Sequence, residues 1–394
     1  MAPDTTDEPT ASAPVATYTD RLTRLAELAG VSGADVVLIT PGPDLAYFIG
    51  HSIGSHERLT CLVVPAAGRP SLLVPTLERP GWSGSPAEEL DVAIGTWTDG
   101  EDPYAALAEL LPADARVLSV DYHMPAVHAL NAQAIVPGSE LTLAGATIAE
   151  LRMRKGADEI GALAAAGAAI DRVQRRIGEW LRPGRTENEV AADIGAAIVA
   201  EGHAWPDFVI VGSGPNGASP HHEASDRVIE PGDVVVIDIG GPMPSGYFSD
   251  CTRTYLVAGA AVPDRVREVY EVVRRAQAAG VAAVRPGVTA ESIDAASRTV
   301  IESAGLGEYF ITRTGHGIGL EVHEHPYLVS GNTITLEEGM AFSVEPGIYL
   351  PGEFGVRIED IVVVGESGAR LMNTAPTELT VVGSPSGPST EGAE

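Results

Sequence analysis

Residues 234–241 read VVVIDIGG, a run of β-branched residues that ends in a carboxylate and two glycines. A run of this composition predicts a buried strand. Residues 246–255, GYFSDCTRTY, predict a second strand that carries another acid. If the two strands pair as a hairpin, Asp238 and Asp250 face each other across it. Two such carboxylates repel each other unless a cation lies between them.

The pattern around these strands occurs twice along the chain. The string RPGRT at 182–186 recurs as RPGVT at 285–289, and two further echoes follow in the same order. A helix is predicted before the first copy, from residue 160 to residue 181, and a capping box begins the helix after it. In this alignment acids fall on acids: Asp238 on Glu345 and Asp250 on Glu359. Residues 151–383 are therefore predicted to form two related αβ halves, each ending in strands that carry two carboxylates.

The second half adds a histidine and two glutamates to the set. Residues 314–319, TGHGIG, place His316 among glycines that leave its imidazole accessible. Glu345 ends an apolar run, and Glu359 follows on another predicted strand with Arg357 on the same face, because side chains alternate along a strand. Four carboxylates and one imidazole favour Mn²⁺, with Co²⁺ or Zn²⁺ as alternatives. Five ligands exceed the need of one catalytic ion and predict two divalent ions, an arrangement suited to hydrolysis.

The composition excludes several classes of partner. There are 25 Lys and Arg residues against 54 Asp and Glu residues, a formal net charge of −29. Such a charge repels nucleic acids and anionic membrane surfaces, so we expect neither as a partner. The two cysteines are too few for a disulfide framework and fit a reducing compartment. No signal-peptide pattern and no membrane-spanning apolar run is present, so we expect a cytoplasmic protein.

The chain is predicted to have four parts. Pro-rich and Ser-rich ends at 1–16 and 384–394 are expected to be disordered tails. Short apolar runs alternate with helical patterns in residues 17–148, which predicts a smaller α/β domain. Its expected strands include a hairpin and lie at 36–39, 61–64, 71–74, 92–97 and 117–120. Residues 149–383 form the predicted catalytic domain.

These strings resemble the pita-bread metallopeptidases, the family of methionine aminopeptidase, aminopeptidase P, prolidase and creatinase. GHGIGLEVHE at 315–324 is most similar to the aminopeptidase P and prolidase branch. The segment at 18–145 resembles the creatinase-type N-terminal domain of that branch. The resemblance implies an α/β (α+β) chain, with a pita-bread domain of two pseudo-symmetric halves behind a smaller α/β domain. It also implies a dinuclear metal site with the ligands Asp238, Asp250, His316, Glu345 and Glu359.

The resemblance implies roles for further side chains as well. It places His221 beside the metals in contact with substrate, and it gives His323 the scissile carbonyl and its oxyanion. Glu345 is implied as ligand and as acceptor of the proton from the attacking water, and Arg357 as support for the ligand strand. Three neighbours of these motifs are not expected to be ligands: His222, His325 and Asp360.

The implied activity is hydrolysis of the Xaa-Pro bond in short proline-containing peptides by a homodimer, with Xaa-Pro dipeptidase favoured. Aminopeptidase P, acting on longer peptides, is the close alternative. Tyr327 stands where prolidases often place an arginine that holds the dipeptide carboxylate. The cluster of His51, His56 and Arg58, reaching over from a second subunit, is another possible source of that cation. A creatinase-like or ectoine-hydrolase-like C–N hydrolase and an inactive binding module are less favoured, because all five ligands are present.

Overall fold

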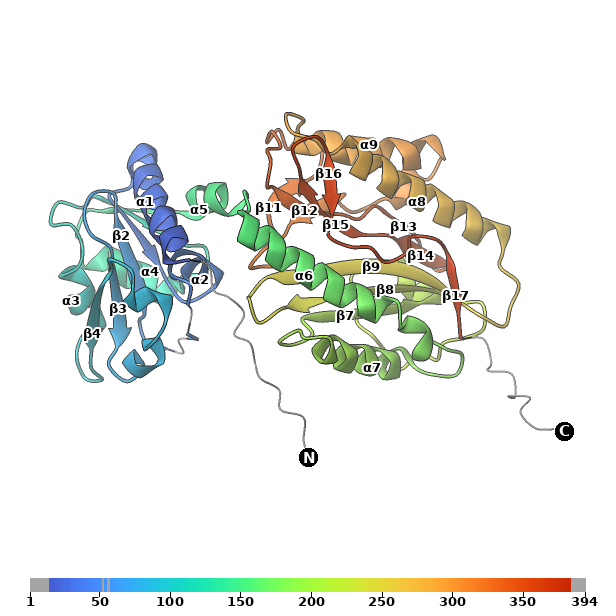
Figure 1. The fold of residues 1–394 in the computed structure, drawn as a ribbon, viewed down its shortest axis with the longest axis horizontal. Coiled ribbons are helices and arrows are strands. Elements are labelled where there is room, and N and C mark those ends of the chain that lie inside the picture. The colour runs from blue at the N-terminus through green and yellow to red at the C-terminus, as the bar shows by residue number, and fades with distance from the viewer. Residues whose placement is uncertain (1–13, 52, 55–56, 384–394) are drawn as a thin grey trace. The chain divides into compact units, whose positions relative to one another are not determined.

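The computed structural model describes residues 14–51, 53–54 and 57–383. The chain divides into two compact units, Met1–Arg152 and Met153–Glu394 (Figure 1). Both are mixed α/β, which confirms the predicted fold class. Residues 1–13 and 384–394 of the expected tails lie outside the described residues, and helix α1 (Val15–Ser32) begins inside the segment predicted as a tail. Among the described residues, no helix is both long enough and apolar enough to cross a membrane.

A six-stranded sheet forms the centre of the first unit, in the order β4-β3-β2-β1-β5-β6. The predicted hairpin is confirmed, because β2 and β3 pair antiparallel. Side chains of α3 and α4 join the apolar core beneath β1, β2 and β5. The strands are β1 (Val36–Ile39), β2 (Cys61–Pro65), β3 (Ser71–Pro75), β4 (Ala93–Trp97), β5 (Val117–Val120) and β6 (Glu140–Leu143). The other helices are α2 (Pro43–Ile49), α3 (Pro103–Ala108), α4 (Ala126–Ala134) and α5 (Gly145–Arg152).

The second unit contains two main sheets with helices packed against them (Figure 1). Helices α6 (Ala157–Gln174) and α7 (Glu187–Ala200) share a core with one sheet, of order β17-β9-β8-β7. Its strands are β7 (Phe208–Ser213), β8 (Val234–Pro242), β9 (Phe248–Val257) and β17 (Thr380–Val382). Helix α8 (Asp264–Ala283) and helix α9 (Ala290–Ser303) contribute to the cores of the second half. Its strands are β10 (Gly315–Gly317), β11 (Glu324–Leu328), β12 (Ala341–Val344), β15 (Asp360–Val364) and β16 (Ala369–Leu371), with a separate hairpin of β13 (Gly347–Leu350) and β14 (Phe354–Arg357).

The sequence echo corresponds to a repeated piece of backbone. The N–H of Gly184 donates to the carbonyl of Ile229, and the N–H of Gly287 donates in the same way to Leu336. Both glycines have φ of 86°, a left-handed conformation that side-chain-bearing residues rarely adopt. The predicted two related halves are therefore present in the structure.

The helix predicted from residue 160 to residue 181 is shorter than expected. Helix α6 ends at Gln174, and a 3₁₀ turn follows at Ile177–Glu179. Ile177 and Leu181 are nevertheless fully buried. The apolar spacing therefore predicted correctly that these side chains are buried. The backbone that places them in the core is a 3₁₀ turn and not a continued α-helix.

The predicted hairpin of β8 and β9 is confirmed, but its register differs from the expectation. Asp238 lies opposite Thr252, and Asp250 lies opposite Gly240. The two aspartates are therefore diagonal neighbours on one face instead of a directly facing pair. Only a glycine fits opposite Asp250, because a Cβ at Gly240 would lie 2.3 Å from the carbonyl oxygen of Ser249.

Candidate metal centre

A cavity of about 610 Å³ lies beside the β8–β9 hairpin. All eight side chains singled out in the sequence line it: His221, Asp238, Asp250, His316, His323, Glu345, Arg357 and Glu359. They come from both halves of the second unit. The fold thus brings together groups that are far apart in the sequence.

His316 lies among the carboxylates. Its Nε2 is 3.1 Å from Oε1 of Glu345 and 3.6 Å from Oδ2 of Asp250. Its Nδ1 is 3.1 Å from the carbonyl oxygen of Gly317, which can only accept a hydrogen bond. Nδ1 therefore carries a proton, and Nε2 faces the carboxylates as the nitrogen that an ion would bind in place of its proton. One ligand atom each from Asp250, His316 and Glu359 lie within 4.8 Å of one another, close enough to share an ion.

Two buried carboxylate oxygens at this site lack a hydrogen-bond donor within the described part of the chain. They are Oδ1 of Asp238 and Oε1 of Glu359. The second oxygen of each group is used: Arg357 donates to Oδ2 of Asp238 at 2.6 Å, and Thr252 donates to Oε2 of Glu359 at 2.7 Å. Leaving a buried polar atom without a partner is costly, so such atoms are rare in folded proteins. These two oxygens and the oxygen-rich donor set fit divalent cations.

The electrostatics of the carboxylates point the same way. Burial, followed by the negative charge of Glu359, raises the pKa of Asp250 well above its ordinary value. Burial and the charge of Glu345 raise the pKa of Glu359 similarly. Burial would also raise the pKa of Glu345, but the hydrogen bond and charge of His316 lower it overall. Positive charge placed among these groups would relieve the repulsion that keeps protons on them.

Arg357 connects Asp238 to the loop that carries His221. It donates to Asp238, to the hydroxyl of Tyr349 at 2.8 Å and to the carbonyl of Pro220 at 3.2 Å. Its Nε also donates to Thr252 at 3.1 Å. One buried guanidinium therefore fixes a carboxylate and the backbone next to His221 together.

The two remaining histidines border the cavity. The ring of His323 lies edge-on to that of His316, with centroids 4.2 Å apart. Partial burial, followed by the positive charges of His316 and Arg313, lowers the pKa of His323 below its ordinary value. His323 is therefore neutral near pH 7 and can donate one hydrogen bond into the cavity. His221 is exposed and borders the cavity from the loop after β7.

Sequence reasoning missed the residue that holds this loop. Glu187, the first residue of α7, is fully buried and accepts hydrogen bonds from side chains and backbone of the 213–225 segment. The donors are Ser213 N and Oγ, Asn216 Nδ2, His222 Nε2, and Ser225 N and Oγ, at 2.6–3.2 Å. The only sequence signal was its place beside the capping box, which suggests a helix start and nothing more. His222, which was not expected to be a ligand, contacts Glu187 here.

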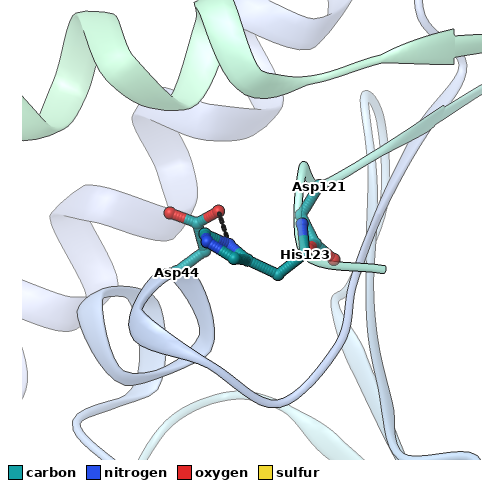
Figure 2. A group of neighbouring side chains, drawn as sticks. All are labelled: Asp44, Asp121 and His123. Carbon is teal, nitrogen blue, oxygen red and sulfur yellow. Dashed lines mark hydrogen bonds and ion pairs between the residues drawn. The ribbon is translucent and has the colours of Figure 1, made fainter. Parts of the chain in front are cut away.

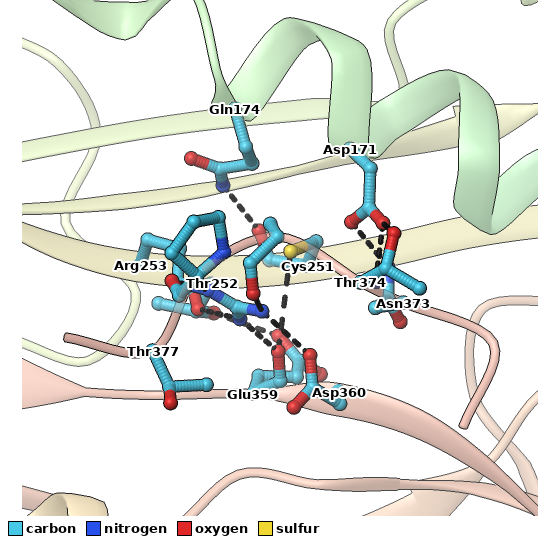
Figure 3. A network of polar contacts seen from close by, with 12 residues as sticks. Asp171, Gln174, Cys251, Thr252, Arg253, Glu359, Asp360, Asn373, Thr374 and Thr377 are labelled. Carbon is cyan, nitrogen blue, oxygen red and sulfur yellow. Dashed lines mark hydrogen bonds and ion pairs between the residues drawn. The ribbon is translucent and has the colours of Figure 1, made fainter. Parts of the chain in front are cut away.

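A second polar network lies behind Glu359 (Figure 3). Arg253 donates to the carbonyl of Glu359 and, at 2.7 Å, to Oδ1 of Asp360. Gln277 donates to the other oxygen of Asp360 at 2.7 Å. Asp360 is thus fully engaged in a buried ion pair next to the ligand strand. Among the other residues not expected to bind metal, the His325 ring packs against Tyr327, with centroids 4.9 Å apart.

The first unit contains another group of possible ligands, Asp44, Asp121 and His123 (Figure 2). Here the carboxylates already have partners. Arg152 donates to Asp44 at 2.6 Å, and Asp121 accepts from the backbone and hydroxyl of Thr40 and from the backbone of His123. Because this cluster satisfies itself, it differs from the orphaned oxygens of the second unit, and we assign no ion to it.

Two residues of the cluster proposed as another source of a carboxylate-binding cation have partners within their own unit. Arg58 forms a two-pronged ion pair with Asp99, at 2.8 and 2.9 Å. Nε2 of His51 lies 3.1 Å from the carbonyl of Gly81. His56 lies outside the described residues.

Comparison with known proteins agrees with the geometry. Residues 161–366 match metallopeptidase family M24, and residues 21–154 match the creatinase/prolidase N-terminal domain. The probable dipeptidase PepE of Mycobacterium bovis is 52% identical over 369 residues, which cover 93% of this chain and 96% of that protein. The Xaa-Pro dipeptidase of Lactobacillus helveticus is 36% identical over 367 residues, covering 89% and 96%. The crystal structure of dipeptidase PepE from Mycobacterium ulcerans has a TM-score of 0.89 and 51% identity, covering 95% of this chain and 100% of that one. The chain therefore belongs to metallopeptidase family M24, whose members are hydrolases that use two divalent metal ions, and it carries a creatinase/prolidase N-terminal domain.

Proposed function

We propose that the protein is an Xaa-Pro dipeptidase that hydrolyses the bond before proline in short peptides. The observation that carries this proposal is the pair of orphaned carboxylate oxygens, Oδ1 of Asp238 and Oε1 of Glu359, at a cavity that two histidines border. The relatives named dipeptidase and Xaa-Pro dipeptidase support the substrate class. The proposed domains are residues 17–148 and residues 149–383.

The ions would be held by Asp238, Asp250, His316, Glu345 and Glu359. Their oxygen-rich chemistry favours Mn²⁺ over Co²⁺ or Zn²⁺. Two bound ions supply an activated water and polarise the scissile carbonyl. Arg357 would keep Asp238 ionised and correctly oriented, since its guanidinium donates directly to that carboxylate.

Three side chains around the ions would have separate roles in the reaction. Glu345 would accept the proton of the attacking water at its carboxylate and return it to the departing proline nitrogen. His323, neutral because of its lowered pKa, would donate a hydrogen bond to the developing oxyanion. His221 would contact the substrate from the opposite loop.

The cavity wall suits a proline ring. Phe208, Ile210 and Val322 line it together with Tyr349. A prolyl amide has no N–H, so a site that depends on donating or accepting at that nitrogen gains nothing from it. A shape-fitted apolar wall gains the buried area of the ring instead.

The finer features remain proposals of the same kind. We propose a cytoplasmic homodimer. The compartment is supported by the two buried free thiols, Cys61 and Cys251, which fit a reducing environment. We propose no nucleic-acid or membrane partner, because of the net charge of −29.

The test is a hydrolysis assay with the intact protein. We expect about two metal ions per chain by elemental analysis. We also expect cleavage of Ala-Pro in the presence of Mn²⁺, faster than cleavage of Ala-Pro-Ala. Cleavage of the tripeptide alone would make the protein an aminopeptidase P. If metal is bound and neither peptide is cleaved, the Xaa-Pro function is wrong.

A further inference from the structure

Glu359 lies at the junction of two strands. Strand β14 ends at Arg357 and β15 begins at Asp360, so the backbone groups of Glu359 lie between the two hydrogen-bond ladders. A buried residue in such a place needs other partners for its N–H, its carbonyl and its carboxylate. Glu359 is only 1% exposed, so those partners decide where its carboxylate points.

Two neighbouring residues of β9 provide most of these partners (Figure 3). The carbonyl of Thr252 accepts from the N–H of Glu359 at 3.1 Å, and the hydroxyl of Thr252 donates to Oε2 of Glu359 at 2.7 Å. Arg253 donates through Nη1 to the carbonyl of Glu359. The polar atom of Glu359 that remains is Oε1, which has no hydrogen-bond donor in the described ranges of the chain.

Arg253 is itself held in one orientation. Its side chain is 3% exposed, and its guanidinium makes five hydrogen bonds, one for each of its N–H groups. Gln277 on α8 donates to the second oxygen of Asp360, which fixes the ion pair from behind. The acceptors of the five bonds, at 2.5–2.8 Å, are the carbonyls of Thr252, Glu359, Ala375 and Pro376 and Oδ1 of Asp360.

The hydroxyl of Thr252 also connects Glu359 to the other half of the site. Nε of Arg357 donates to this hydroxyl at 3.1 Å, and Nη2 of Arg357 donates to Oδ2 of Asp238 at 2.6 Å. Because Nε–H can only donate, the hydroxyl accepts from it and directs its own proton at Glu359. One connected set of hydrogen bonds therefore holds one oxygen of Asp238 and one of Glu359, and in each carboxylate the other oxygen is the orphaned one.

Resting on the proposed two-ion site, we propose that Thr252 and Arg253 are positioning residues that hold Glu359 as a preformed ligand and thereby set the affinity of the site for divalent cations. Neither side chain belongs to the described lining of the cavity, so both act through Glu359. Thr252 orients the carboxylate, and Arg253 with Asp360 holds the backbone. A ligand that is already in place loses less freedom when an ion binds.

The experiment titrates the metal-free protein with Mn²⁺ in competition with a fluorescent chelator. Thr252→Val removes only the hydroxyl, and it should raise the dissociation constant for Mn²⁺ by about 10- to 100-fold, the usual effect of losing a partner that orients a metal ligand. Thr252→Ser keeps the hydroxyl and should stay within about threefold of wild type. Cleavage of Ala-Pro by Thr252→Val should fall at limiting Mn²⁺ and recover when Mn²⁺ is raised.

Thr40→Val is the matched control in the first unit. Thr40 is 2% exposed, and its hydroxyl donates at 3.1 Å to the buried carboxylate of Asp121, to which we assign no ion. The same substitution there removes the same kind of hydrogen bond. It should lower the melting temperature of the metal-free protein, as Thr252→Val does, but leave the dissociation constant for Mn²⁺ within about twofold.

An exchange of two side chains tests the contribution of Arg253 and Asp360, and it serves also if Thr252→Val does not fold. Asp360→Asn turns an NH₂ group towards Arg253 or towards Gln277, so two donors face each other, and Mn²⁺ should bind about 10- to 100-fold more weakly. The double variant Asp360→Asn/Gln277→Glu pairs donors with acceptors again and should restore most of the affinity.

Two results would overturn the proposal: wild-type affinity for Mn²⁺ in Thr252→Val, or equal losses of affinity in Thr252→Val and Thr40→Val. Wild-type protein that binds no divalent ion would overturn both this inference and the proposed metal site. If Mn²⁺ binds tightly to wild type and weakly to Thr252→Val, but Ala-Pro and Ala-Pro-Ala are not cleaved, the inference holds and the Xaa-Pro function falls.

Discussion

The substitution Glu187→Gln removes one charge from a fully buried side chain and keeps its shape. Oε1 of Glu187 accepts from the backbone and hydroxyl of Ser213, and Oε2 accepts from the backbone and hydroxyl of Ser225 and from His222. A glutamine must direct its NH₂ group at one of these sets. At least one backbone N–H then faces another donor and is left without a partner.

The size of the effect follows from the pKa of this carboxyl group. Burial by itself would raise it, but hydrogen bonds from Ser213, Ser225 and His222 lower it from 4.5 to about 2. A shift of that size corresponds to about 3 kcal/mol of folding free energy. Because the pKa of the folded state is depressed, this stability is fully present above pH 4.5 and is lost as the pH falls toward 2.

Urea unfolding of the metal-loaded protein measures the difference. We expect Glu187→Gln to lower the free energy of unfolding by about 3 kcal/mol at pH 7. The difference in unfolding free energy between wild type and Glu187→Gln should shrink by about 1.4 kcal/mol at pH 3.5, because only the wild type loses the contribution of this carboxylate. Protonation of the metal ligands affects both proteins alike and cancels. Since the loop carries His221, kcat/KM for Ala-Pro should also fall, by up to about 100-fold.

Glu189→Gln, in the same turn of α7, is the control. Glu189 is exposed and accepts from the backbone of Thr186, a contact that glutamine can also make. Its ion pair with Arg185, at 3.8 Å, is a partly exposed contact of small energetic value. The effect of Glu189→Gln should stay within about 0.5 kcal/mol at both pH values. A Glu187→Gln penalty below about 1 kcal/mol, or one that does not change with pH, would refute the reasoning.

Three further predictions concern the metals, the single lysine and the thiols. Chelation should abolish activity and lower the melting temperature, and Mn²⁺ should restore both. Each ion present at 100 times its dissociation constant stabilises the folded protein by about 2.7 kcal/mol. An unchanged melting curve after complete metal removal would contradict the proposed metal site. Nζ of Lys155 lies 2.8 Å from Glu324, and both side chains are almost fully buried. Lys155→Met should lower the free energy of unfolding in urea by about 3–5 kcal/mol, because it leaves the buried carboxylate of Glu324 without its cation. The double variant Lys155→Met/Glu324→Gln removes that charge and should be more stable than Lys155→Met alone. Cys61 and Cys251 are fully buried, and burial raises the pKa of each, so Ellman's reagent should detect neither thiol before denaturation and two per chain afterwards; rapid labelling of the native protein would show that the cores are open.

The sequence predicted the fold class and the family, and all eight side chains it singled out lie around one cavity. The reason is local. Strand alternation fixes which face carries Asp238 or Glu359. The glycines around His316 led us to expect an accessible imidazole, but the structure buries this ring at the cavity wall, and the glycines instead allow close approach of the backbone at Ser343 and His325. The repeated RPG strings mark equivalent turns of the two halves. The alignment that pairs Asp238 with Glu345 and Asp250 with Glu359 therefore predicted equivalent positions in the two halves.

Other features depended on contacts that no local pattern contains. The register of the β8–β9 hairpin made Asp238 and Asp250 diagonal neighbours, which periodicity alone does not decide. Helix α6 ended early because a 3₁₀ turn buried Ile177 equally well. Glu187 appeared in the sequence as an ordinary acid at a helix start.

The sequence by itself therefore identified the candidate ligands and the kind of element on which they lie. Only the tertiary structure decided what holds those residues and what faces the substrate. Glu187 and His222 meet across 35 positions of the chain, and Arg313 lies on a different segment from the Tyr327 ring that supports it. Periodicity records whether a side chain is buried, but a partner distant in sequence is set by how the elements pack.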